Sequence, residues 1–221
     1  MSNQITIYEV GPRDGLQNEK VLWDTASKLR FVDHLVDAGL TEIELTSFVH
    51  PKAVPQMADA DEVMRASLAK YADRPVRFTG LVLNERGYDR ALAAGCNSMA
   101  FGVAVSNTFS QQNTRMSNKE ALALTERLIR RAWADNVRVR VYLMTAWVCP
   151  FEGPTPPPKT LAYAEEIWQM GIDEFAIADT IGHAHPLEVG RLFDLLGRRM
   201  DMRRLAAHLH DTQALGLANA A

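Results

Sequence analysis

Residues 9–19 read Glu-Val-Gly-Pro-Arg-Asp-Gly-Leu-Gln-Asn-Glu, and they follow a short apolar run, residues 5–10, that is typical of a β-strand. The two glycines and the proline in this stretch break the strand. We therefore expect Arg13 and Asp14 to lie on a loop at the end of the strand.

A second strand-like run, residues 205–211, reads Leu-Ala-Ala-His-Leu-His-Asp. Successive strand residues point to opposite faces, so His208 and His210 share one face. We predict that they meet Asp14 around a divalent metal ion, because one carboxylate and two imidazoles suit a borderline or hard cation. The alternative is a pair of histidines held by ordinary hydrogen bonds, but their position at the end of a strand, before Asp211, favours the metal.

Strand-like and helix-like segments alternate along the whole chain. Strands are predicted at residues 5–10, 42–46, 76–83, 98–105, 137–144, 172–178 and 205–210. Helices are predicted at residues 24–38, 59–71, 85–94, 118–134 (with Asn118 as its cap), 159–170 and 186–198. This pattern indicates parallel βαβ architecture with seven βα-like units.

Two parallel folds fit this pattern, an open doubly wound sheet and a TIM (β/α)8 barrel. The phosphate-binding fingerprints of the open sheet, G-x-G-x-x-G and G-x-x-x-x-G-K-[ST], are missing. Polar residues gather just after the strands, where a barrel carries its active site. They are Arg13, Asp14, Ser47, Asn84, Asn107, Asp179, Thr180, His210 and Asp211. The sequence therefore predicts the barrel.

The eighth βα unit of that barrel is missing from the 221 residues. Ten residues follow Asp211, enough to begin a seventh helix but too few for an eighth strand. A seven-unit barrel would leave two unpaired sheet edges, which invite aggregation. We expect residues 1–221 to be a single catalytic barrel domain that is truncated at its C-terminus; a partner chain that closes the sheet is the alternative.

Composition narrows the class of protein. The hydrophobic share of 47% and charged share of 23% are those of an ordinary soluble globular protein. A net charge of -3 argues against a nucleic-acid partner, and no apolar run is long enough for a membrane span. Residues 1–4 do not look like a secretory leader. The distant Cys96 and Cys149 indicate neither a disulfide framework nor a zinc site, so we expect a reducing cytoplasm. A homodimer is left open.

Charged residues near the first two strands have a functional and a structural interpretation. Arg13 is either a surface ion pair with Asp14 or a donor aimed at an oxyanion. Glu44 points away from its apolar neighbours in the strand. It is either an outward-facing polar edge residue or an inward carboxylate, which needs a partner such as Arg13 or the metal. His183 and His185 share the i, i+2 spacing but follow a glycine, so we expect a solvated loop there.

Six stretches together resemble one family. They are residues 9–20 (EVGPRDGLQNEK), 44–48 (ELTSF), 51–56 (PKAVPQ), 149–153 (CPFEG), 179–182 (DTIG) and 208–212 (HLHDT). In this order they closely resemble 3-hydroxy-3-methylglutaryl-CoA lyases, members of a metal-dependent lyase and synthase superfamily of TIM barrels. The resemblance runs from residue 5 to the end of the chain.

The resemblance implies retro-Claisen cleavage of an acyl-CoA, 3-hydroxy-3-methylglutaryl-CoA, to acetoacetate and acetyl-CoA, as in leucine degradation and ketone-body formation. It implies that Asp14, His208 and His210 bind Mg²⁺ or Mn²⁺ and that Asp14 or His208 removes the hydroxyl proton. Arg13 would stabilise the thioester enolate, and Glu44 would orient Arg13 and the substrate. The positions that would line or brace the substrate site are Glu9, Gln17, Asn18, Lys20, Ser47 and Asp179.

The chain departs from the family at its end. Members carry a catalytic cysteine in a glycine-rich loop and, further on, a metal-binding asparagine, and both would lie beyond Ala221. Cys149 matches a different family cysteine, and Cys96 is expected to be a small buried residue near a strand start. We therefore expect the 221 residues to bind metal weakly and to turn over slowly or not at all.

Three alternatives stay open beside this lyase. The first is a lyase for a larger 3-hydroxyglutaryl-CoA homologue. The second is a Claisen-type synthase or aldolase of the same superfamily, although Leu16 and Gln17 after the glycine favour the lyase. The third is an inactive barrel that serves as a binding module.

Overall fold

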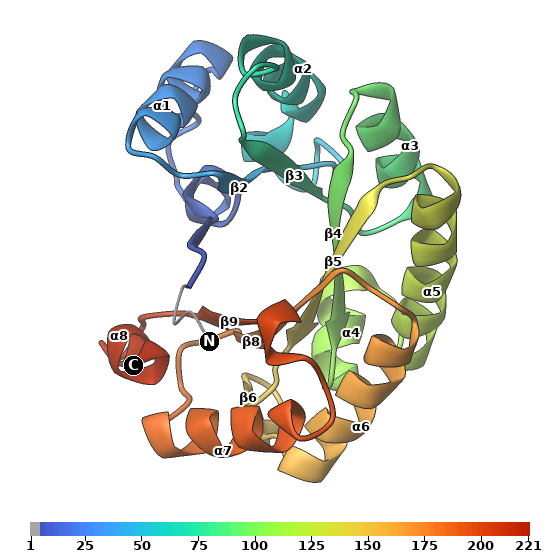
Figure 1. Ribbon diagram of the computed structural model, residues 1–221. Coiled ribbons are helices and arrows are strands. Elements are labelled where there is room, and N and C mark those ends of the chain that lie inside the picture. The colour runs from blue at the N-terminus through green and yellow to red at the C-terminus, as the bar shows by residue number, and fades with distance from the viewer. Residues whose placement is uncertain (1–4) are drawn as a thin grey trace. The chain divides into compact units, whose positions relative to one another are not determined.

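The computed structural model describes residues 5–221, which form parallel strands alternating with helices (Figure 1). The main sheet is built from β1 (Tyr8–Glu9), β2 (Glu42–Ser47), β3 (Arg77–Leu81), β4 (Ser98–Ala104), β5 (Arg138–Met144), β8 (Glu174–Asp179) and β9 (Leu205–Leu209). Their order in the sheet is their order along the chain. The pairings of β1 with β2, β2 with β3, β3 with β4, β5 with β8 and β8 with β9 are parallel. The predicted α/β architecture is confirmed.

The helices follow the strands as expected for βα units. They are α1 (Thr25–Asp37), α2 (Ala60–Lys70), α3 (Glu85–Ala93), α4 (Asn107–Thr114), α5 (Asn118–Ala134), α6 (Pro157–Gln169), α7 (Pro186–Gly197) and α8 (Gly216–Ala220). Shorter elements are the turns η1 (Gly11–Gly15), η2 (Pro55–Met57) and η3 (Met202–Arg204), and the antiparallel pair β6 (Val148–Cys149) and β7 (Gly153–Pro154). None of the helices in the described part of the chain has the length and apolar character to cross a membrane.

The chain divides into two compact units, one ending at Ala100 and the other beginning at Phe101. In the first unit, α1 and α2 pack side by side (Figure 1). Asp24 caps the N-terminus of α1, since its carboxylate accepts a hydrogen bond of 2.6 Å from the amide of Ser27. The prediction that residues 1–221 form a single domain stays a prediction, and residues 1–4, for which we expected no leader, lie outside the described residues.

Phe48, which directly follows β2, is packed against two glycines of the first unit. A Cβ atom added at Gly80 would lie 2.6 Å from Cε2 of the Phe48 ring. A Cβ atom added at Gly87 would lie 2.6 Å from the Phe48 backbone oxygen. Both approaches are closer than atomic contact allows, so only glycine fits at each position as long as Phe48 keeps its present place.

In the second unit, both faces of the parallel strands are covered, as is usual for such sheets. Val139, Val141 and Leu143 of β5 are fully buried on one face. Arg140 and Tyr142 alternate with them and are also buried on the other face. The second face therefore holds polar side chains away from water, where they must be paired.

Three local predictions were wrong, and some elements were missed. Only Tyr8–Glu9 of the predicted strand 5–10 joins the sheet, and Ile5 and Ile7 are exposed. Arg13 and Asp14 lie in the helical turn η1 rather than on an open loop, because Pro12 is compatible with the first turn of a helix. Helix α4 and the β6–β7 pair were not predicted.

The third wrong prediction concerns the start of α5. Ser117, and not Asn118, caps this helix: its hydroxyl accepts a hydrogen bond of 3.2 Å from the amide of Glu120. The Glu120 carboxylate accepts a bond of 2.8 Å from the amide of Ser117, which completes a capping box. The side-chain amide of Asn118 instead donates to the backbone oxygen of Val105, at 3.1 Å.

Candidate metal centre and active site

The first unit contributes a buried cation at η1. Nε of Arg13 donates to Oε1 of Glu44 in β2, and Nη1 of Arg13 lies 3.0 Å from Oδ1 of Asp14. Glu44 is fully buried, which an unpaired carboxylate would not tolerate. The expectation that Glu44 needs a partner such as Arg13 is therefore confirmed.

The backbone around this pair is held by further hydrogen bonds. The hydroxyl of Tyr8 donates to Oε2 of Glu44 at 3.3 Å. Oε1 of Glu9 accepts a hydrogen bond of 2.6 Å from the amide of Gly11, where η1 begins. The side-chain amide of Asn18 donates to the backbone oxygen of Asp14 at 3.0 Å. These bonds fix the turn that carries Arg13 and Asp14.

The second unit contributes two imidazoles. His208 lies in β9 and His210 follows the end of that strand, and their Nε2 atoms are 3.1 Å apart. Each ring is partly exposed. The predicted i, i+2 arrangement on one face is confirmed.

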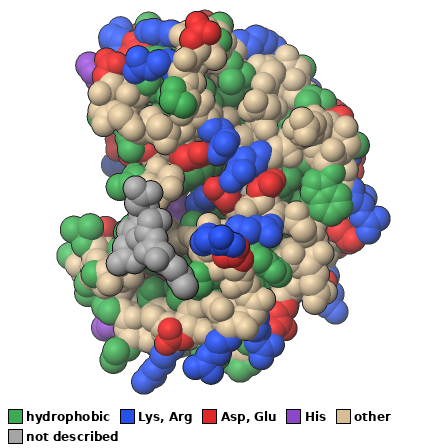
Figure 2. Space-filling view, in the orientation of Figure 1, with side chains coloured by type: hydrophobic (Ala, Val, Ile, Leu, Met, Phe, Trp, Pro, Cys, Tyr) green, Lys and Arg blue, Asp and Glu red, His purple; other side chains and the backbone are tan. Residues whose placement is uncertain are grey.

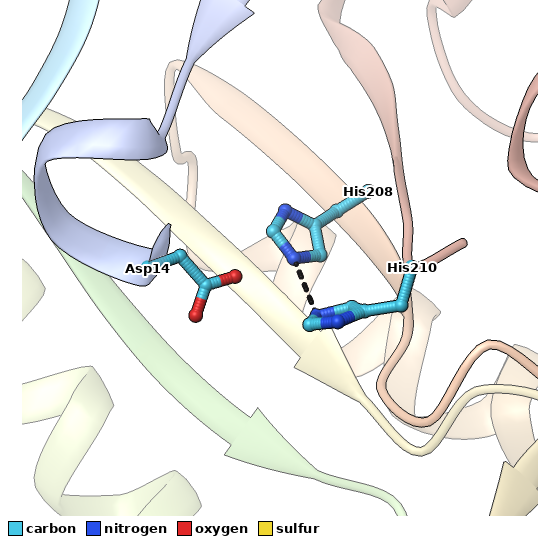
Figure 3. A group of neighbouring side chains, drawn as sticks. All are labelled: Asp14, His208 and His210. Carbon is cyan, nitrogen blue, oxygen red and sulfur yellow. Dashed lines mark hydrogen bonds between the residues drawn. The ribbon is translucent and has the colours of Figure 1, made fainter. Parts of the chain in front are cut away.

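Among the described residues, one group of acidic, histidine and cysteine side chains has the ligand atoms to hold a metal ion. It consists of Asp14 from the first unit and His208 and His210 from the second (Figure 3). Imidazole suits transition-metal ions such as Fe²⁺ and Zn²⁺, and carboxylate suits Mg²⁺ and Mn²⁺, so the mixed donor set fits a divalent cation. A possible metal-binding cluster is thus present.

The other predicted substrate-site residues differ in exposure. Ser47 is fully buried, and its hydroxyl lies 3.4 Å from the backbone oxygen of Leu81. Asn18 and Lys20 are exposed. Oε1 of Gln17 is buried and has no hydrogen-bond partner. Their roles toward a substrate stay predictions.

Asp179 shapes the loop that follows β8. Its two carboxylate oxygens accept hydrogen bonds from the amides of His183, at 3.1 Å, and Ala184, at 3.0 Å. This bonding accounts for a fully buried carboxylate without a cation. The side chains of His183 and His185 are exposed on that loop, as predicted.

Sequence reasoning missed the residue that joins the loops of the second unit. Thr145, directly after β5, is fully buried and has a φ angle of 55°. Such a left-handed conformation is a genuine outlier for a β-branched residue. Its hydroxyl donates to the oxygen of Met144 at 2.7 Å and accepts from the amide of Ser106 at 3.2 Å, and its amide donates to Oγ1 of Thr180 at 2.7 Å.

The loop after β5 is also attached to the start of α4. Glu152 accepts a hydrogen bond of 2.8 Å from the amide of Thr108, and this bond is the main reason that the pKa of Glu152 is lowered to about 2. The thiol of Cys149 donates to Oγ of Ser106 at 3.0 Å. Cys96 is buried near the start of β4, as expected, and burial raises the pKa of its thiol to about 11.

The surface charge is mixed. On the face drawn in Figure 2, Lys and Arg side chains lie among Asp and Glu side chains rather than in one continuous basic area. This distribution agrees with the net charge of -3.

Known proteins resemble this chain over nearly its full length. The hydroxymethylglutaryl-CoA lyase YngG of Bacillus subtilis is 38% identical over 218 residues, which are 98% of this chain and 71% of that protein. A Pseudomonas aeruginosa protein named 3-hydroxy-3-isohexenylglutaryl-CoA/hydroxy-methylglutaryl-CoA lyase is 40% identical and covers 99% of this chain and 72% of its own length.

Solved structures agree with these relatives. The crystal structure of the Bacillus subtilis lyase superposes with a TM-score of 0.94, at 36% identity, over 99% of this chain and 72% of that one. The carboxyl transferase domain of Rhizobium etli pyruvate carboxylase superposes with a TM-score of 0.73 at only 14% identity, which shows the shared fold alone. The HMGL-like family matches residues 4–221, and the chain belongs to that family.

Proposed function

We propose that this protein is a divalent-metal-dependent carbon–carbon lyase that cleaves 3-hydroxy-3-methylglutaryl-CoA to acetoacetate and acetyl-CoA. The observation that carries the proposal is the group of Asp14, His208 and His210, in a chain whose relatives are named hydroxymethylglutaryl-CoA lyases. The buried Arg13 beside Asp14 supplies the fixed positive charge that enolate chemistry requires.

Asp14, His208 and His210 would hold the ion, which we propose to be Mg²⁺ or Mn²⁺. Bound there, such an ion would act as a Lewis acid toward the substrate oxygens and would make the C3 hydroxyl group easier to deprotonate. Asp14 or His208 accepts the hydroxyl proton. The C2–C3 bond then breaks, its electron pair passes to the thioester as an enolate, and the ketone of acetoacetate forms.

Arg13 faces the charge that develops in this step. Its guanidinium group stabilises the enolate oxygen until the enolate carbon takes up a proton to give acetyl-CoA. Glu44 acts through Arg13, because the bond from Nε to Oε1 fixes the plane of the guanidinium group. Gln17, Asn18, Lys20, Ser47 and Asp179 are proposed to line or brace the substrate site.

A larger substrate is the second candidate. The Pseudomonas aeruginosa relative, 40% identical, is named for both an isohexenyl and a methyl substrate. A lyase of the same mechanism that also accepts a longer substituent at C3 is therefore a specific alternative to test. The cytoplasm is the proposed location, which the two free cysteines support, and a homodimer stays a prediction.

The test is a cleavage assay with 3-hydroxy-3-methylglutaryl-CoA and its isohexenyl homologue, in the presence of Mn²⁺ and after chelation. It is run on the 221-residue chain and on any longer product of the same gene. We expect Mn²⁺-dependent release of acetoacetate by the longer product, and a loss of at least about 100-fold in its kcat for Arg13→Gln. His183→Ala is the control. Cleavage of neither substrate by either protein would overturn the proposal.

A further inference from the structure

The ring of Tyr142 lies against one of the candidate metal ligands within the second unit. Its centroid is 5.4 Å from the centroid of the His208 ring, and the two ring planes meet at 80°, edge to face. Such an arrangement is favourable for aromatic pairs and restricts the orientation of both rings. Tyr142 is itself buried, so its ring is held in place.

The two residues are separated by an entire strand. Tyr142 lies in β5 and His208 in β9, and β8 runs between them. Neighbouring strands are about 4.8 Å apart, so the side chains must cross about 10 Å. They can do so only if the intervening strand presents small side chains on the same face.

Strand β8 meets this requirement with two alanines. Tyr142 pairs with Ala176, and His208 pairs with Ala178. Glu174 pairs with Arg140 in the strand register, and the two side chains form an ion pair, so they lie on the same face of the sheet. Ala176 and Ala178 follow Glu174 at intervals of two residues and therefore lie on this face as well, together with Tyr142. The alanines leave the space through which Tyr142 reaches His208.

Arg140 also contacts the ring of Tyr142. Its guanidinium carbon lies 5.2 Å from the centroid of the Tyr142 ring, within the range of a cation–π interaction. Nη1 of Arg140 donates to Oε2 of Glu174 at 2.9 Å, and Arg138 donates to Oε1 of the same carboxylate at 3.0 Å. A fixed cation therefore holds the aromatic ring that contacts His208.

We propose that Arg140 and Tyr142 are positioning residues that fix the ring of His208, and that Ala176 and Ala178 are required to be small for this purpose. The contact restricts the direction in which Nε2 of His208 points. The role of His208 as a ligand rests on the proposed function, but the orientation of its ring does not. The two can therefore be tested separately.

The first experiment measures the His208 ring in the metal-free chain by ¹H–¹³C NMR, at one fixed pH for all variants. Tyr142→Leu removes the aromatic ring. Ala176→Val fills the space that the alanine side chain leaves between Tyr142 and His208. Both are expected to move the His208 resonances toward those of exposed imidazoles. Tyr142→Phe, which keeps the ring, is expected to leave them in place.

Ala207→Val is the matched control for Ala176→Val. It is the same substitution, in β9 beside His208, but the Ala207 side chain is exposed and points to the other face. Backbone amide spectra establish that each variant is folded. His208 resonances that stay unchanged in both Ala176→Val and Tyr142→Leu, or that move as much in Ala207→Val, would overturn the inference.

The second experiment measures Mn²⁺ binding by electron paramagnetic resonance. Residues that orient a metal ligand typically change metal affinity by about 10- to 100-fold when replaced. We expect a loss of that size in Tyr142→Leu and Ala176→Val, and no loss in Tyr142→Phe or Ala207→Val. Absence of Mn²⁺ binding by the unmodified chain would count against the proposed metal centre, while the NMR result still decides the inference.

Discussion

Arg13 and Glu44 form an ion pair whose side chains are only 9% and 0% exposed, with Nε of the arginine donating to Oε1 of the glutamate. Both charges have been removed from water, so each depends on the other. Removing one partner of such a pair leaves an uncompensated buried charge, which costs more than the pair itself contributes.

Replacing Glu44 by alanine should therefore destabilise the fold strongly. We expect a loss of about 3–5 kcal/mol in the free energy of unfolding, measured by urea denaturation. The double variant Arg13→Met/Glu44→Leu should regain part of it, because no buried charge is left unpaired. Glu126→Ala, which breaks an exposed pair in α5, should cost about 0.3–0.5 kcal/mol. Equal losses for Glu44→Ala and Glu126→Ala would contradict this account.

Metal binding should be visible as thermal stabilisation even without turnover. A ligand at about 100 times its Kd stabilises the folded state by about 2.7 kcal/mol, so Mn²⁺ should raise the Tm of the unmodified chain. His210→Ala should abolish this rise. The double variant His183→Ala/His185→Ala removes an exposed pair with the same spacing and should preserve it. A rise that survives in His210→Ala would exclude the proposed ligand set.

The hydroxyl of Thr145 should be more important than its methyl group. Thr145→Val keeps the shape of the side chain but leaves the amide of Ser106 without its bond, and we expect a loss of about 1–3 kcal/mol. Thr145→Ser keeps the hydroxyl and removes the branched carbon at a left-handed position, so it should be neutral or stabilising. Chemical denaturation of both variants distinguishes them, and equal losses would show that the hydrogen bonds do not matter.

Glu152 should make stability depend on pH in the acid range. Its pKa in the folded chain is about 2, lowered mainly by the amide of Thr108, whereas an unfolded glutamate has a pKa of about 4.3. A lowered folded pKa gives stability that is present above about pH 4.3 and is lost as the pH falls toward 2. The Tm difference between the unmodified chain and Glu152→Gln should therefore shrink over that interval.

Lys159→Met serves as the comparison for this titration. Its amino group lies 3.6 Å from Glu152, but it is the smallest contributor to the lowered pKa. The acid dependence of Tm should therefore be nearly unchanged in Lys159→Met. If the acid dependence of Tm disappeared in Lys159→Met but persisted in Glu152→Gln, the amide of Thr108 would not be the main cause of the lowered Glu152 pKa.

Strong local signals predicted most of the fold. Helix α1 begins after the capping residue Asp24, and α3 begins after Asn84, whose side chain accepts from the amide of Gly87 at 2.8 Å. Gly95 and Gly171 end α3 and α6 with φ angles of 83° and 75°. Helix α4 could not be predicted this way, because its polar sequence has no apolar stripe and its N-terminus is held by Glu152 from a later loop.

The candidate site was predictable where its geometry follows from one strand. Alternation in β9 was enough to place His208 and His210 on one face. The contact of Tyr142 with His208 depends on the register of three strands and on the small size of Ala176, and no single stretch of sequence contains that information. The left-handed backbone conformation of Thr145 could not be predicted from the sequence either, since threonine seldom adopts it.

The two glycines packed on Phe48 impose different constraints on how the sequence can change over evolution. At Gly80 the nearest obstacle is the Phe48 ring, and the sulfur of Cys96 follows at 3.3 Å, so a smaller residue at position 48 would remove the closer of two side-chain contacts to an alanine there. At Gly87 the obstacle is a backbone oxygen, which every amino acid at position 48 retains. Homologous sequences can therefore exchange Gly80 together with Phe48, whereas Gly87 has no compensating partner at that position.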